Sequence, residues 1–211
     1  MNGTMGFSPT NQQQIVDAFN SQTYISDQVD VQHTPIYDTV TIAAGGTLST
    51  LTSAFFQNVG PQSNKTLAST NMNQPGRLQA PEAFSIFSFR LRIAENILQA
   101  DMLTIMSGFA LQFIIGQKSY NLAPIWHYNA GGGIFGQGAT AVGPVTPSNL
   151  SNGVPARTHM HKLAIPIVIE NQANFSAALI GTTVTLTAGG SGGTGATLQL
   201  LLDGLYARGV Q

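Results

Sequence analysis

FSIFSFRLRI, at residues 84–93, is the segment with the clearest strand pattern in this chain. Phe87, Phe89, Leu91 and Ile93 alternate there with Ser88, Arg90 and Arg92. Successive side chains of a strand point to opposite faces of its sheet, so the alternation predicts a strand with one buried face and both arginines on the outer face. The fold is therefore expected to be built around a β-sheet.

Similar patterns recur along the chain and predict further strands. They cover residues 36–42, 109–115, 119–127 with an interruption at Pro124, 162–170, 175–187 and 197–210, with a weaker candidate at 28–33. A hairpin is expected around Gly116 and Gln117, and a bulge at Gly181. Apolar residues at helical spacing predict short helices over 10–20 and 96–106. Many strands with few helices predict an all-β fold, a sandwich or a barrel.

The organisation predicted from length is one domain, since 211 residues suffice for a single all-β core. Residues 1–30 are expected to form an N-terminal arm with the short helix, and residues 31–211 the β-domain. Residues 129–157 carry seven glycines and three prolines and no charge before Arg157. Loops of that length are uncommon inside compact domains unless they have a function, so a functional Gly-rich loop is predicted.

The composition is poor in charge. The chain has 8 Lys or Arg, 9 Asp or Glu and a net charge of −1, against 31 Asn or Gln. No basic run is present to neutralise a phosphate backbone, which argues against direct sequence-specific binding of nucleic acid. A surface with few ions loses little hydration when it packs against a neighbour, which favours a building block over an enzyme.

Targeting signals are not expected either. The start, MNGTMGFSPTNQQQ, lacks the basic and apolar regions of a secretory signal. The apolar run at 109–115 is far shorter than the ~20 residues that a membrane-spanning helix needs. Cysteine is absent, so disulfides and thiolate metal sites are excluded and the redox compartment stays open.

His159 and His161 are the residues that a metal site would use, because two histidines two apart on a strand project to the same side. The segment that opens at Gly153 resembles the start of the cupin metal motif. That motif continues with a carboxylate three or four residues on and a later histidine, whereas here the next carboxylate is Glu170 and no histidine follows. We therefore expect no bound metal and no other cofactor.

Other catalytic patterns are also missing. No serine lies in the strand–turn–helix context of a GxSxG elbow, and the Gly-rich segments 131–138 and 189–195 lack the strand–helix context of a phosphate-binding loop. Arg90, Arg92 and Arg208 are expected to form structural ion pairs or contacts between subunits. The acids near strand ends are expected to be solvated or turn-forming: Glu82, Glu95, Asp101 and Glu170. The chain is predicted not to be an enzyme and to have no small-molecule substrate.

An alternative hypothesis is a carbohydrate- or receptor-binding β-sandwich module of a phage fibre or spike. Exposed aromatic and amide side chains hold sugars in such modules. The residues that would do so here are Trp126, Tyr128 and Asn129, which follow one another closely at the end of a predicted strand.

A family resemblance accompanies these patterns. It rests on NMNQPGRLQAPEAF at 71–84 leading into the long strand, on the Gly-rich central loop, and on the ending LDGLYARGVQ at 202–211. In that ending Leu202, Gly204, Arg208 and Val210 approximate an L-G-x-x-R-x-V tail. Over residues 30–211 the chain resembles the single jelly-roll capsid proteins of icosahedral bacteriophages and archaeal viruses, in the lineage of tectiviruses and membrane-containing viruses.

The resemblance implies a single jelly-roll, a two-sheet sandwich or barrel, as the finer fold. It also implies a capsid subunit that self-assembles into an icosahedral shell with copies of itself and other capsid proteins. The N-terminal arm would reach a neighbouring subunit or an internal membrane. The protein would be made in the host cytoplasm and reside in the virion.

Overall fold

The computed structural model describes residues 29–59, 63–94, 97–128, 135–138, 148–151, 156, 162–191 and 193–209. The predicted helix over 10–20 lies outside these residues, as does the predicted arm except for its last two positions. None of the helices in the described part of the chain has the length and apolar content needed to span a membrane.

One antiparallel sheet is built around the long strand β13. Its strands are β1 (Val29–His33), β2 (Ile36–Ile42), β5 (Ala83–Ile93), β10 (Lys162–Ile169) and β13 (Ala196–Gly209). β13 pairs with β5 on one side, and on the other side with β2 along its first half and β1 along its second half. β10 adds to the far edge of β5. We call this the first sheet.

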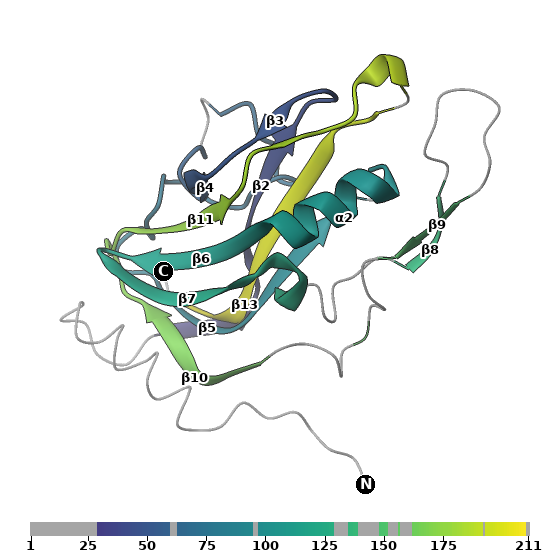
Figure 1. Cartoon of the computed structure of the whole chain (residues 1–211). Helices are drawn as coiled ribbons and strands as arrows, with labels where there is room; N and C mark the ends of the chain where they lie inside the picture. The colour runs from purple at the N-terminus through teal and green to yellow at the C-terminus, as the bar shows by residue number, and fades with distance from the viewer. Residues whose placement is uncertain are drawn as a thin grey trace, which may run out of the picture.

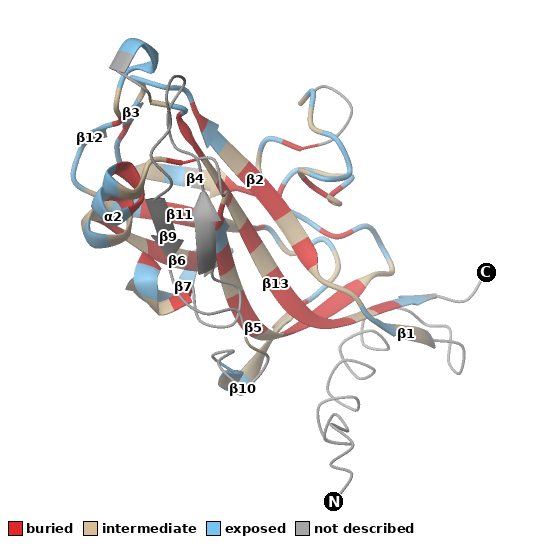
Figure 2. Ribbon diagram, turned by 90° about the vertical axis from the view of Figure 1, so that its right-hand side faces the viewer, coloured by how far each residue is buried: buried red, intermediate tan, exposed pale blue. Residues whose placement is uncertain are grey.

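The second sheet has four strands in the order β4, β11, β6, β7, with bounds Leu51–Phe55, Phe175–Gly181, Phe109–Ile115 and Lys118–Pro124. It lies in front of β13 and β5 in Figure 1, and Figure 2 shows β2, β13 and β5 of the curved first sheet side by side. Smaller elements are β3 (Thr47–Leu48), β12 (Val184–Thr185), β8 (Phe135–Gly138), β9 (Ser148–Ser151), α2 (Gln99–Gly108), η1 (Ile125–Tyr128) and η3 (Gly189–Ser191). The architecture is therefore mostly β, with two facing antiparallel sheets and one short α-helix among the described residues.

The strand pairs of the two sheets are nested along the chain. β6 pairs with β7 through a tight turn at Gly116, whose φ is +59°. Outside this hairpin β5 pairs with β10, then β4 with β11, and then β2 with β13. The outer pairs alternate between the two sheets, so both sheets contain strands from the first and the second half of the chain.

The core lies between the two sheets and is rich in aromatic rings. Phe89 of β5 meets Phe113 of β6 across the interface, with ring centroids 5.2 Å apart. Phe113 is also 6.1 Å from Phe175 of β11, and all three rings are buried. The alternate positions of β13 supply Leu198, Leu200 and Leu202 to the same core. Figure 2 shows the resulting buried stripes along β13 and β5.

The free edge of β2 is covered by the loop that follows β4. Asn71 accepts a hydrogen bond from the Tyr37 N–H at 2.9 Å and donates one to the Pro35 carbonyl at 2.8 Å. Thr39 donates its hydroxyl to the Ser69 carbonyl at 2.7 Å. These contacts satisfy backbone groups that an open sheet edge would leave unpaired.

The predicted strands at 28–33, 36–42, 84–93, 109–115, 162–170 and 197–210 are confirmed within one or two residues. The hairpin at Gly116 is confirmed as well. The predicted helix at 96–106 appears as α2, shifted toward the C-terminus. The all-β prediction is confirmed, and strands β3, β4, β8, β9 and β12 add to it.

One prediction about β5 was wrong: Phe87 does not share the inner face with Phe89. Asp203 pairs with Ser88 and Gly204 pairs with Ile86, which leaves Phe87 as the extra residue of a bulge. A bulge inserts one residue and reverses the alternation, so Ile86 and Phe89 both face the core. Phe87 instead packs in a separate cluster with Leu205, Ala83 and Ala207.

Two strand boundaries also differ from the prediction. The strand predicted over 119–127 ends at Pro124, which has no N–H to continue the pairing, and the chain then forms η1. The segment 175–187 is two strands, β11 and β12, instead of one strand bulged at Gly181. Gly181 pairs regularly with Phe109, and the register shift lies earlier, between Ala177 and Leu179 on the β4 side.

Candidate functional surfaces

The candidate metal ligands His159 and His161 lie outside the described residues. Within the ranges that the structure does describe, no three His, Asp or Glu side chains gather in a way that could hold a metal ion. Glu95 also lies outside the described part of the chain.

Two of the three candidate sugar-binding residues, Trp126 and Tyr128, do not share a surface. Trp126 is 59% exposed, whereas Tyr128 is buried and places its ring 6.1 Å from that of Phe89. The Tyr128 hydroxyl donates to the Leu111 carbonyl at 3.5 Å. Asn129 lies outside the described residues. The structure therefore leaves Trp126 as the exposed aromatic side chain of the pair.

Burial raises the pKa of the Tyr128 phenol to about 12, although a backbone hydrogen bond from Ala123 lowers it. The folded protein thus keeps a proton that the unfolded chain loses near pH 10. This contribution to stability is complete below pH 10 and is lost as the pH rises toward 12, at about 1.4 kcal/mol per pH unit. We expect urea denaturation across this range to show a shallower alkaline loss for Tyr128→Phe than for wild type. Tyr120→Phe, at a half-exposed position, is the control and should match wild type.

Arg90 and Arg208, two of the three arginines predicted to be structural, form ion pairs. Arg90 of β5 makes a two-pronged pair with Asp203 of β13, including an Nη2–Oδ1 distance of 2.6 Å. Arg208 pairs with Asp30 of β1 at 3.0 Å, in a more exposed position. Both pairs join neighbouring strands of the first sheet, so this part of the prediction is confirmed.

Of the acids predicted to be solvated or turn-forming, Glu82 forms a turn contact, whereas the prediction was wrong for Asp101, which is buried in a helix. Glu82 accepts the Gln79 N–H at 3.0 Å. Asp101, in the first turn of α2, is buried and accepts the N–H and the hydroxyl of Thr187, the latter at 2.9 Å. It thereby fixes the helix to the segment before β13.

Asp38 is a buried carboxylate that was not predicted from the sequence. It lies on the inner face of β2 and is fully buried. Its Oδ1 is 2.7 Å from Nζ of Lys65, and its Oδ2 accepts the Phe56 N–H at 2.7 Å. The signal was present in the sequence, since position 38 is in phase with the apolar residues Ile36 and Val40.

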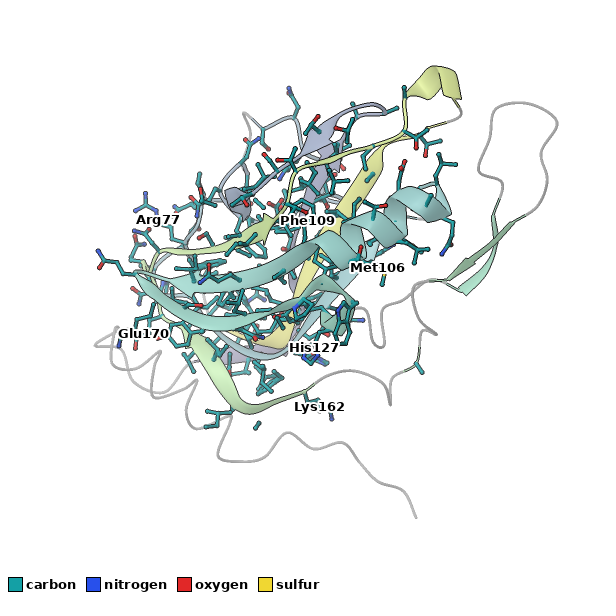
Figure 3. All side chains as sticks on the ribbon, in the orientation of Figure 1. Arg77, Met106, Phe109, His127, Lys162 and Glu170 are labelled. Carbon is teal, nitrogen blue, oxygen red and sulfur yellow. The ribbon has the colours of Figure 1, made fainter. Side chains whose placement is uncertain are left out.

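A polar cleft of about 180 Å³ lies where the β1–β2 turn, the loop before β5 and the end of β13 meet. Its polar lining consists of Gln32, Thr34, Asn71, Asn73, Gln74, Arg77, Gln79, Glu82, Tyr206 and Arg208. Arg77 is exposed and projects away from the sheets (Figure 3). Within the described part of the chain its guanidinium makes no hydrogen bond or ion pair. The cleft therefore presents a charged donor at its rim.

Tyr206 and Glu82, two residues that line the cleft, interact with each other. Burial raises the pKa of Tyr206 well above its ordinary value, and a hydrogen bond to Glu82 and the charge of Glu82 add to the rise, against an opposing effect of Arg208. Tyr206 therefore stays a neutral hydroxyl under all ordinary conditions. Glu82 interacts with both Tyr206 and the Gln79 N–H, and so holds these two parts of the cleft lining together.

Comparison of the chain with protein-family models, with curated proteins and with solved structures found no match.

Proposed function

We propose that this chain is a capsid subunit with a single jelly-roll fold, which self-assembles into the icosahedral shell of a virus. The observation that carries the proposal is the nested strand pairing. Counting β2, β4, β5, β6, β7, β10, β11 and β13 as eight strands, the first pairs with the eighth, the second with the seventh, the third with the sixth and the fourth with the fifth. A long antiparallel hairpin folded over into two four-stranded sheets, as in a jelly roll, has this order.

The jelly roll also occurs in lectins and in cupins, so the fold alone does not choose the function. Charge favours the capsid. A subunit that meets identical copies around several symmetry axes avoids like-charge repulsion if its surface has few ions. The net charge of −1 and the 17 charged side chains, 8 basic and 9 acidic among 211 residues, suit such contacts.

The partners implied are further copies of the chain and other capsid proteins. The N-terminal residues 1–28 precede β1, at the end of the first sheet, and are proposed to reach a neighbouring subunit or an internal membrane. The location is then the virion, after synthesis in the host cytoplasm.

Particle formation by the purified full-length chain tests the proposal. We expect closed particles of uniform size in electron micrographs, with light scattering that depends on salt and pH. Small species under every condition, with no lattice even at high protein concentration, would contradict a self-assembling shell subunit.

A second candidate function, sugar binding by a fibre or spike module, is favoured by the polar cleft. Amides, an exposed guanidinium and a tyrosine hydroxyl are groups that hydrogen-bond sugar hydroxyls or a sugar carboxylate. The volume of about 180 Å³ suits a single sugar unit, since pockets for larger ligands measure roughly 300–1,000 Å³. The site that we propose for this function is therefore the cleft at Arg77, whose lining does not include Trp126.

Arg77→Ala is expected to weaken glycan binding at least about tenfold, because it removes a charge-assisted donor worth roughly 1.5–3 kcal/mol. A glycan array followed by titration with the best ligand measures the effect. Arg92→Ala, which removes an arginine from the exposed outer face of β5, is the matched control and should bind like wild type. Binding that survives Arg77→Ala, or an array with no reproducible ligand, would remove this candidate.

A further inference from the structure

The outer face of the first sheet carries an apolar cluster near the end of β13. Gly204 lies opposite Ile86, which faces the core, so the next residue, Leu205, points away from the core. Leu205 is nevertheless only 3% exposed. It packs with residues of β1, β5 and β13 in a group that we call the outer cluster: Val31, Ala83, Phe87, Leu205 and Ala207.

The polar residues beside the outer cluster are buried as well. Ser85 pairs with Leu205, and Ser88 pairs with Asp203. All three polar side chains are buried, and the hydroxyls of Ser85 and Ser88 have no hydrogen-bond partner in the described part of the chain. In Figure 2 the buried part of β13 continues into the stretch beside β1. A large side chain on the face of a sheet loses contact with water only where other atoms lie over it, so this half of the outer face is covered.

The cover that the structure describes lies over another part of the sheet. Gln199 donates its side-chain amide to the Ala68 carbonyl at 2.9 Å, so the loop after β4 lies over the first half of β13. Leu205 is six residues further along the strand, or roughly 20 Å away. Among the described elements outside this sheet, β4 and η1 make the most extensive contacts with it, and both do so on the core side. The cover of the outer cluster therefore comes from residues outside the described ranges.

Two stretches outside those ranges are long enough to cover the outer cluster: residues 1–28 and the parts of 129–161 that flank β8 and β9. The others have at most three residues each. Charge distinguishes the two. The described outer face beside the cluster carries three basic side chains and one acid, which are Arg90, Arg92, Lys162 and Asp203. Residues 129–161 contain no acid and include Arg157, whereas residues 1–28 contain Asp17 and Asp27 and no Lys or Arg. A face with excess positive charge attracts the acidic stretch.

We propose that residues 10–28 of the same chain pack on the outer cluster and cover it. This segment leads directly into β1, and Val31 of β1 is itself a member of the cluster. The helix predicted over 10–20 places Ile15 and Phe19 on one face, where they supply apolar contacts. Such a helix is about 16 Å long, and the five residues of β13 from 203 to 207 extend over about 13 Å, so the two lengths match.

The polar residues of the segment suit the two buried serines. Of the nineteen residues from 10 to 28, eleven are Asn, Gln, Ser or Thr. Their side chains carry donors and acceptors that can bond the hydroxyls of Ser85 and Ser88, and buried hydroxyls in folded proteins normally have such partners. The inference goes beyond the proposed function and does not rest on it, because a covered face belongs to the single subunit. The proposed reach toward a neighbouring subunit or a membrane then belongs to residues 1–9.

Thiol labelling of the full-length chain tests the cover, because the native chain has no cysteine. Ser85→Cys is a nearly isosteric probe of the outer face, Ala177→Cys probes the core, and Thr41→Cys is an exposed reference on β2. We expect Ser85→Cys to react with a water-soluble disulfide reagent at least about tenfold more slowly than Thr41→Cys. Equal rates at these two positions would overturn the proposal.

Substitutions in the segment identify it as the cover. Ile15→Asp with Phe19→Asp removes the apolar contacts and should raise the labelling rate of Ser85→Cys at least about tenfold, while Ala177→Cys stays slow. Gln14→Asp with Ser21→Asp adds the same charge to the opposite side of the predicted helix and should leave Ser85→Cys slow. Labelling of Ser85→Cys that ignores the first pair of substitutions would overturn the proposal. So would labelling that rises on dilution, because the cover would then come from a second copy.

Cross-linking gives a second measurement that keeps the apolar residues of the segment intact, and it decides the matter if the aspartate variants unfold. Asn20→Cys is combined with Lys162→Cys, an exposed position on β10 that pairs with Ser88 on the outer face. A short bismaleimide should link these two thiols within one chain. Asn20→Cys with Gly190→Cys, in η3 before the opposite end of β13, is the control and should link at least about tenfold more slowly. Equal linking of the two pairs, or linking only between chains, would overturn the proposal.

Discussion

Asp38→Ala is expected to destabilise the protein by about 3–5 kcal/mol, because it leaves the Lys65 ammonium without its partner in a nearly water-free site. The Lys65 side chain is only 16% exposed and Asp38 is fully buried. The substitution also removes the acceptor of the buried Phe56 N–H, and an unsatisfied buried donor costs a further ~1–3 kcal/mol when no water replaces the acceptor.

The position of Asp38 explains why the effect should be global. The carboxylate ties the inner face of β2 to the end of β4 through Phe56 and to the following loop through Lys65. That loop continues into the segment that covers the free edge of β2 through Ser69 and Asn71. Loss of the ion pair is therefore expected to weaken two sets of contacts at once. These are the contacts between β2 and the end of β4, and those by which the following loop covers the free edge of β2.

Urea denaturation with a matched set of variants measures the effect. Asp30→Ala breaks the exposed Arg208 pair and should cost less than about 1 kcal/mol. The double variant Asp38→Ala with Lys65→Met should recover part of the loss, because no buried charge is left unpaired. If Asp38→Ala were no worse than Asp30→Ala, the buried pair would have no structural role.

The sequence predicted those strands whose alternation is regular, such as β2, β6 and β13. β4 was not predicted, because LTSAF lacks alternation and its pairing with β11 shifts register between Ala177 and Leu179. Such a strand is defined by its neighbour in space. The same holds for Phe87, whose face depends on a bulge set by the partner strand, more than a hundred residues away.

For the candidate sites, the sequence predicted what kind of interaction a residue would make but not which residues would lie together. The residue types suggested ion pairs for Arg90 and Arg208, and the strands brought Asp203 and Asp30 beside them. The polar cleft could not be predicted, because its lining comes from three separate segments that only the fold unites. The fold also separates residues that the sequence had grouped. The 3₁₀ turn after Pro124 directs the ring of Tyr128 into the core and leaves Trp126 exposed.

Gly204→Ala is expected to have one of the largest effects of a methyl group added to a glycine in the described part of the chain. A Cβ at position 204 would lie 1.9 Å from the Ser85 carbonyl oxygen and 2.8 Å from Cζ of Phe84. The first contact is with the backbone of the paired strand, which no side-chain rotation relieves. We expect a loss of more than about 4 kcal/mol, or no folded protein at all.

The matched control is Gly190→Ala in η3, where an added Cβ meets nothing within 4 Å. That variant should be neutral or slightly more stable, since alanine restricts the unfolded chain. Soluble yield and urea midpoints compare the two variants. A Gly204→Ala protein that unfolds at the same urea concentration as Gly190→Ala would show that the β13–β5 pairing can shift to make room.

The bulge explains why β13 cannot shift at Gly204 without disturbing the core residues of β5. Gly204 lies opposite Ile86, beside the extra residue Phe87, where the register of the two strands changes. Moving the bulge toward the end of β5 would reverse the alternation of the residues that it passes, turning Ser88 into the core and Phe89 outward. β13 is paired on both sides, with β5 and with β1 and β2, so it cannot swing outward as an edge strand would. The glycine is thus the residue that allows the two halves of β5 to keep both Ile86 and Phe89 in one core.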